Sequence, residues 1–306
     1  MGSSEITAEH LLKCVQQYER LASLRNQTTE AVVATGTRSD VSTTLPLVDS
    51  PYHIKYQWDA GTLKIISLSC KGPHGRGQSK LSGQVEAWIS ANKLDTIVAA
   101  DVDVIRKMGD KGSAGDVAIA PLHKGEEPKS MGITFPRLII ELEVNNRGPS
   151  EMRETCASYF LDNAATPGSG AYVRAVLGIK VWVEERHACA ILWMRPEGSE
   201  AAAPEVQQAW IFGVGPGISA AQQRAFEAPM EDSALPPVPR HLWQRSHVPA
   251  SPFSPGSHNP RPIVRIPSAT ILYRVSTASR ARISDIIDAT KELEIDLGRV
   301  FDVCCA

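Results

Sequence analysis

The sequence predicts an α/β or α+β protein in which a mixed sheet carries helices on its faces. Apolar segments of strand length recur along the chain, and segments with helical spacing of apolar residues interrupt them. Hydrophobic residues make up 42% of the 306 residues, which is typical of a globular protein with a buried core. The order of elements, a helix, a meander, a helix and further strands, is typical of a sheet covered by helices.

The N-terminal region, residues 1–50, is predicted to hold one helix and a linker. Leu11, Leu12, Val15 and Leu21 recur at helical spacing within residues 6–24, which predicts an amphipathic helix. The stretch 26–50 is rich in Ser and Thr and has little periodicity, so we expect a linker there.

The central region, residues 51–215, is predicted to form the main domain. Segments 53–58 and 62–68 flank the turn-forming Asp59-Ala60-Gly61, which predicts a hairpin. Residues 72–77 are expected to form a loop, because the segment contains three glycines and a proline. Helices are predicted at 79–92 and 150–162. Further strands are predicted at 95–107, 115–120, 136–144, 173–183, 188–194 and 206–214.

The C-terminal region is predicted to be a Pro/Arg-rich extension. The stretch 233–284 contains many prolines and no Asp, Glu or Lys, so we expect most of it to be extended or disordered. We assign 216–268 as a linker and 269–306 as a returning strand (269–275) followed by an acidic helix (284–300). The acids of that helix indicate a solvated side or a side that faces a protein partner.

The composition excludes several classes of protein. The net charge of −2 excludes a strongly basic nucleic-acid-binding protein, so any such binding needs a local patch. The six cysteines form no C-x-x-C pair, which favours reduced, mostly buried thiols over a disulfide scaffold or a zinc site. No apolar run is long enough to span a bilayer and no signal peptide is recognisable, so we expect a protein of the cytoplasm or nucleus that is neither secreted nor bound to a membrane.

One strand-like segment carries most of the chemical information. In 136–144, alternation places Glu141 and Glu143 on the same face, roughly 6–7 Å apart. Asp116 opens the apolar segment 115–120, and it could complete an oxygen-only cluster if the two strands are neighbours. Such a cluster suits Mg²⁺ or Mn²⁺, and phosphodiester hydrolysis uses such ions. The alternative is that these acids bind no metal, since any half-exposed strand displays acids at alternating positions.

A family resemblance adds to this pattern over residues 51–195. The run 56–66, then His74-Gly75, a helix, the segment 115–119 and Leu138-Ile139-Ile140-Glu141 together resemble the Uma-type restriction endonucleases of the PD-(D/E)xK nuclease superfamily. The resemblance implies a restriction-endonuclease-like mixed central sheet flanked by helices. The N-terminal helix and the Pro/Arg-rich C-terminal extension are additions to that domain.

The resemblance also implies roles for single residues. Asp116 matches the acid of the "PD" motif, with Gly115 in place of the proline, and Glu141 matches the acid of "ExK". Glu143 stands at the position of the lysine, which gives an E-x-E variant. The implied function is Mg²⁺- or Mn²⁺-dependent cleavage of nucleic acid, with DNA favoured. The rivals are a non-catalytic nuclease-fold module that binds nucleic acid or protein, and a scaffold that assembles through the C-terminal helix.

Further candidate residues have two interpretations each. Lys180, within an apolar strand, could replace the missing motif lysine or could extend from a strand edge to solvent. His74 could contact phosphate or water, or could be a solvent-facing loop histidine. The arginines of the extension could pair with phosphates or with the acidic C-terminal helix. The candidates for nucleic acid contact are Arg240, Arg245, Arg261 and Arg265.

Overall fold

The fold is known from a computed structural model of the chain. It describes residues 72–100, 115–122, 136–144, 148–161, 172–197, 202–214, 217–229, 235–247, 261–275, 285–288 and 290–306. For the strands β1, β2, β3, β5 and β6 and for the first residues of α7, only the backbone element is described. The predicted helix 6–24 lies outside the described residues.

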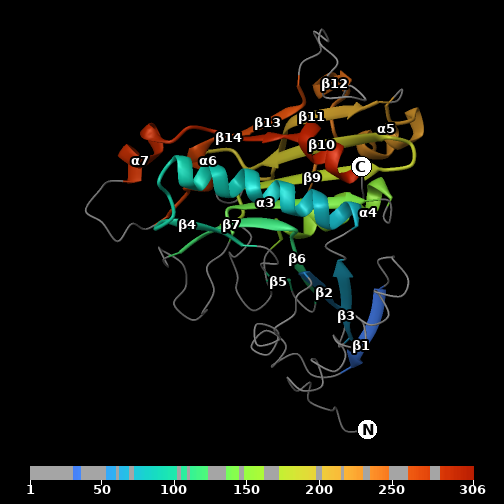
Figure 1. Cartoon of the computed structure of the whole chain (residues 1–306), viewed down its shortest axis with the longest axis horizontal. Coiled ribbons are helices and arrows are strands. Elements are labelled where there is room, and N and C mark those ends of the chain that lie inside the picture. Colours follow the sequence, from blue (N-terminus) through green and yellow to red (C-terminus); the bar gives the residue numbers. More distant parts are fainter. Residues whose placement is uncertain are drawn as a thin grey trace.

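A mixed sheet of seven strands forms the centre of the molecule (Figure 1). The neighbours β11 and β12 are parallel, as are β8 and β9, and the other neighbours are antiparallel. In spatial order the strands are β12 (Trp243–His247), β11 (Glu205–Gly213), β10 (His187–Met194), β9 (Ala175–Trp182), β8 (Leu138–Val144), β7 (Val117–Pro121) and β4 (Val98–Asp101).

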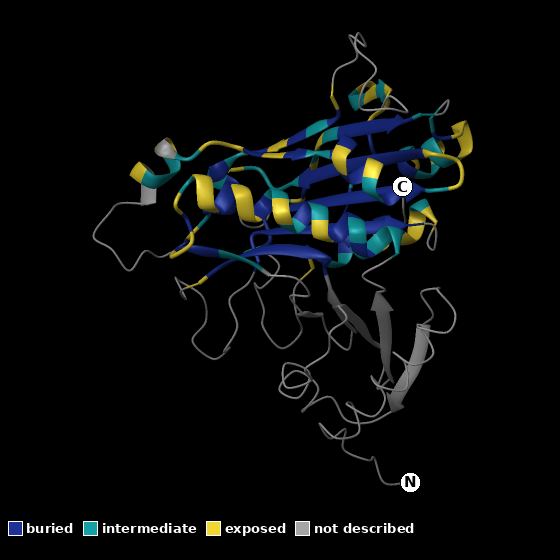
Figure 2. Ribbon diagram, viewed as in Figure 1, coloured by how far each residue is buried: buried dark blue, intermediate teal, exposed yellow. Residues whose placement is uncertain are grey.

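Helices cover both faces of this sheet, and the alternation of side chains along the strands creates two hydrophobic clusters. Helix α3 (Pro73–Ala91) and helix α8 (Leu297–Cys304) pack on one face with Leu138, Ile140 and Leu142 of β8. Helices α4 (Pro149–Ser158) and α5 (Ala220–Glu227) contribute to the opposite cluster, which contains Ile139. Figure 2 shows the strands as the most continuously buried part of the molecule.

The strands predicted from apolar runs are confirmed, with small shifts at their ends. The segments 173–183, 188–194 and 206–214 correspond to β9, β10 and β11, and 136–144 corresponds to β8. The segment 95–107 was expected to form one strand, but it is divided between β4 and β5 (Ile105–Met108). The predicted helix 150–162 is α4.

The expected loop at 72–77 is wrong, because helix α3 already begins at Pro73. A proline suits the first turn of a helix, where its missing N–H group is not needed. Gly75 and Gly77 are buried. A Cβ atom at position 77 would lie 2.6 Å from both Cys304 Sγ and Leu142 Cδ2, so this glycine permits the close approach of α3 to α8 and β8.

The C-terminal elements also differ from the prediction. Segment 269–275 contains helix α6 (Ser268–Ile271) and a turn, not a strand. The expected helix 284–300 is divided into α7 (Ile283–Ala289), β14 (Leu293–Asp296) and α8. In β14 the burial alternates: Leu293 and Ile295 are buried and Glu294 is exposed, which is the period of a strand.

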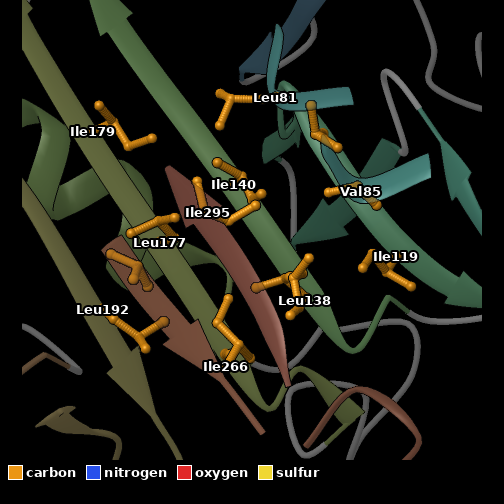
Figure 3. Packing of buried hydrophobic residues seen from close by; sticks show 14 of the residues in the cluster. Leu81, Val85, Ile119, Leu138, Ile140, Leu177, Ile179, Leu192, Ile266 and Ile295 are labelled. Atoms are coloured by element: carbon orange, nitrogen blue, oxygen red, sulfur yellow. The ribbon is translucent and has the colours of Figure 1, made fainter. Parts of the chain in front are cut away.

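Two more strands and a short helix lie in the stretch that was expected to be extended or disordered. Strand β13 (Ile263–Ile266) pairs with β14, and η4 (Arg240–Leu242) leads into β12. Figure 3 shows Ile266 and Ile295 of this pair among Leu138, Leu177 and Leu192 of the central sheet. The described part of residues 261–306 therefore packs on the core.

A second sheet has the strand order β1-β3-β2-β6-β5. The hairpin predicted at 53–68 is confirmed as β2 (His53–Asp59) and β3 (Thr62–Leu68). Strand β1 (Glu30–Thr35), which pairs with β3, lies within the region that was expected to be a linker. Strand β6 (Lys111–Ala114) was not predicted. No helix in the described part of the chain is long and apolar enough to cross a membrane.

Candidate functional site

Asp116 lies where β7 begins, beside the middle of β8. Its side chain is fully buried. Its backbone N–H donates to the Ile140 carbonyl at 3.0 Å, and its carboxylate Oδ2 accepts the Leu142 N–H at 2.6 Å. These two bonds bracket Glu141. The segments that carry Asp116 and Glu141 are therefore neighbours, which is the condition that the predicted acid cluster requires.

Two residues of α3 hold Asp116 in place. His74 Nε2 lies 3.3 Å from Asp116 Oδ1 and 2.7 Å from the Leu142 carbonyl, so a proton on Nε2 is needed to satisfy both acceptors. The side-chain amide of Gln78 donates to the Asp116 carbonyl at 2.8 Å. His74 therefore belongs to a helix and contacts the acid, in contrast to the solvent-facing loop histidine that the sequence left open.

Glu141 is held from the other face of the sheet. Its carboxylate accepts a hydrogen bond from the Tyr159 hydroxyl at 2.8 Å, and both side chains are fully buried. Tyr159 ends helix α4, whereas His74 begins α3. The contacts of Asp116 and Glu141 thus come from helices on opposite faces of the sheet.

Glu143 and Lys180 are direct neighbours across the parallel strands β8 and β9. Lys180 also pairs in register with Cys189 of β10, so a carboxylate, an ammonium and a thiol lie in one row across three strands. Lys180 is fully buried, and its Nζ lies 5.6 Å from the centre of the Trp182 ring. Lys180 therefore does not extend from a strand edge to solvent. Asp116, Glu141, Glu143 and Lys180 together are named the acid–lysine centre.

Burial shapes the electrostatics around this centre. Desolvation raises the pKa of the Cys189 thiol, and the positive charge of Lys180 partly opposes this shift. On α4, Arg153 is buried and donates to the carbonyls of Ala225 and Ala228 at the end of α5. Burial lowers the pKa of this guanidinium, because desolvation disfavours its charged form. The face of the sheet that carries Glu141 is therefore shielded from solvent by α4 and α5.

The three acids have the ligand chemistry that suits a metal ion, but their side chains are not arranged around one position. Three carboxylates offer the hard oxygen ligands that Mg²⁺ and Mn²⁺ prefer. Within the described residues, which include all three acids, no group of three or more His, Cys, Asp or Glu side chains is placed to hold one ion. We therefore assign no reaction step to a metal in this arrangement.

The candidate arginines fall into two pairs. Arg265 forms an ion pair with Glu294 at 2.9 Å, and Arg261 lies 4.0 Å from Asp296. Of the two interpretations of Arg261 and Arg265, the structure therefore contains the pairing with acids of the C-terminal segment. Arg240 and Arg245 are exposed, and Arg245 donates to the Gln223 side chain at 3.0 Å.

Sequence reasoning missed Tyr159 and Gln78 as parts of the centre. Neither residue was placed in a candidate site. Neither residue carries a signal at the sequence level, because their contacts with Glu141 and Asp116 join segments 18 and 38 residues apart.

We expect Tyr159→Phe to destabilise the fold by about 1–3 kcal/mol, because the buried Glu141 carboxylate loses a hydrogen-bond donor. Urea unfolding of wild type, Tyr159→Phe, Glu141→Gln and the double variant gives the coupling energy between the two side chains. Independent effects of the two substitutions would show that this hydrogen bond contributes nothing to stability.

Comparison with known proteins does not establish a family. No protein-family model and no curated protein matches the chain. One solved structure to which it is similar is a candidate nuclease belonging to DUF820 from Anabaena variabilis ATCC 29413. The identity is 14% and the TM-score 0.31, over 52% of this chain and 76% of that chain. A similarity this low shows neither the family nor the activity of the chain.

Proposed function

We propose that the chain is a nuclease of restriction-endonuclease-like type that hydrolyses nucleic acid phosphodiester bonds at the acid–lysine centre. One observation carries the proposal: three acids and a lysine lie on β8 and on the neighbouring segments of β7 and β9, and all four are buried. Buried charged groups are costly, so a cluster of them is a candidate functional site.

The residues have the chemistry that hydrolysis requires. Glu143 would take a proton from the attacking water as the water oxygen bonds to phosphorus. The Lys180 ammonium would offset the charge on the phosphoryl oxygen and donate a proton to the leaving oxygen, whose bond to phosphorus breaks. Asp116, fixed by His74 and the Leu142 N–H, would orient the segment that carries Glu141 and Glu143. The resemblance of 115–119 and 138–141 to the nuclease motifs is further support.

A second candidate function is a nuclease-fold module that binds without cutting. The observation that favours it is the full burial of Asp116, Glu141 and Lys180, since a substrate must reach the groups that act on it. The hydrogen bond of Tyr159 to Glu141 is also the kind of contact that a purely structural acid makes.

The test is cleavage of supercoiled plasmid and of single-stranded DNA and RNA by the full chain, with Mg²⁺, with Mn²⁺ and with EDTA. We expect cleavage by wild type, and about a 10²–10⁴-fold loss in Glu143→Gln, measured where the variant is folded. The control is Glu154→Gln, the same substitution at an exposed position of α4, which should cut like wild type. A well-folded wild type that cuts no substrate in any condition would favour the binding module.

A further inference from the structure

A basic surface lies at the free edge of the central sheet, away from the acid–lysine centre. Residues 235–247 contain no Asp or Glu, and they carry Arg240, His241, Arg245 and His247, all exposed. Strand β12 is the last strand of this sheet in the part of the chain that the structure describes. The exposed Arg224 of the neighbouring α5 adds one more cation. These five residues are named the β12 surface.

Side-chain contacts connect the β12 surface to α5. The rings of Trp243 and Phe226 pack edge to face, with centroids 6.0 Å apart, which joins β12 to α5. Arg245 donates to Gln223, and the same glutamine donates to Glu227 at 2.7 Å. Among the described residues, Arg240 and Arg245 form no ion pair, whereas Arg261 and Arg265 do.

We propose that the β12 surface binds the phosphate backbone of nucleic acid. Guanidinium groups donate in pairs to phosphate oxygens, so exposed arginines suit this ligand. Charges on an edge strand also prevent the pairing of sheets, which is their ordinary structural role. Preventing the pairing of sheets needs charge only on the strand itself. Here cations are also present on η4 and α5, which that role does not explain.

Register relates this surface to the acid–lysine centre. Glu143, Lys180, Cys189, Ile211 and Arg245 form one row across five adjacent strands. Four strand spacings place Arg245 about 19 Å from Glu143. A duplex advances about 3.4 Å per phosphate along each strand, so the two positions lie roughly six base pairs apart. Any effect of the β12 surface on cleavage rests on the proposed function. Binding of nucleic acid by the β12 surface does not.

The test is binding of a fluorescein-labelled 20-base-pair DNA duplex to the full chain in EDTA, followed by fluorescence anisotropy over a series of salt concentrations. Arg240→Gln/Arg245→Gln should lower the slope of log affinity against log salt by about 2, since each phosphate contact contributes about 0.9. Arg261→Gln/Arg265→Gln removes the same formal charge from arginines paired with acids, and should leave the slope nearly unchanged. Arg240→Lys/Arg245→Lys should restore most of the slope.

Three results would overturn the proposal: no binding by wild type at low salt, equal losses in both glutamine pairs, or tighter binding of a poly-glutamate peptide than of DNA. The last result would assign the edge to an acidic protein strand. Cleavage separates the two proposals. A wild type that binds and never cuts overturns only the nuclease proposal, and a wild type that cuts while both glutamine pairs change the salt slope equally overturns only this one.

Discussion

Deletion of residues 261–306 is expected to abolish folding of the chain. This segment supplies ten fully buried or nearly fully buried side chains to the cluster on the α3 face of the sheet: Val264, Ile266, Ile271, Leu272, Leu293, Ile295, Leu297, Val300, Phe301 and Cys304. Burial of one large apolar side chain contributes about 1.5–3 kcal/mol. The whole set therefore exceeds the roughly 5–15 kcal/mol by which a domain is stable.

Circular dichroism and thermal unfolding of the chain 1–260 test this expectation. The truncated chain should lack a cooperative transition and should aggregate, because β8, β9 and β10 lose the layer formed by β13, β14 and α8. Two controls separate burial from charge and length: deletion of Ala306 alone, and Arg261→Gln/Arg265→Gln in the full chain. A truncated chain that melts cooperatively within a few degrees of wild type would show that the segment is dispensable.

Strands buried on both faces could be predicted from the sequence, because long apolar runs bounded by turn residues leave few alternatives. Segments 173–183 and 188–194 are of this kind, and β9 and β10 follow them closely. The hairpin at 53–68 was also predictable, because Asp59-Ala60-Gly61 is a turn signal between two alternating segments.

The errors occurred where tertiary packing overrides a local signal. Gly75 and Gly77 indicate a loop by composition, yet both lie in α3, where Gly77 permits the close approach of Cys304 and Leu142. Residues 290–296 continue an apparently helical pattern, yet Leu293 and Ile295 pair with β13 as a strand. Both outcomes depend on partners more than 25 residues away in the sequence.

The candidate site was predictable only in part, for the same reason. Alternation alone places Glu141 and Glu143 on one face of β8. The nearness of Lys180 to Glu143 depends on the parallel register of β8 and β9, which no local pattern specifies. The contact between His74 and Asp116 depends on the packing of α3 against the end of β7. The full burial of the centre likewise depends on α4 and α5, and the sequence had indicated only α4.

Glu143→Gln is expected to lower the rate constant for phosphodiester cleavage by about 10²–10⁴-fold, because the amide cannot take a proton from water. The substitution keeps the size of the side chain and removes its charge beside Lys180. Some loss of stability is therefore also expected, since a buried cation loses a neighbouring anion. Cleavage should be measured well below the melting temperature of the variant, so that the rate reports on chemistry and not on unfolding.

A companion substitution separates a catalytic Glu143 from a structural one. In Glu143→Gln/Lys180→Met both charges of the neighbouring pair are absent, and methionine suits the apolar surroundings of Lys180. If Glu143 and Lys180 only balance each other's charge, the double variant should regain both stability and cleavage. If Glu143 is the base and Lys180 offsets charge on the phosphoryl group, the double variant should regain stability and cut no faster than Glu143→Gln. Cleavage by Glu143→Gln at the wild-type rate would remove Glu143 from the chemistry altogether.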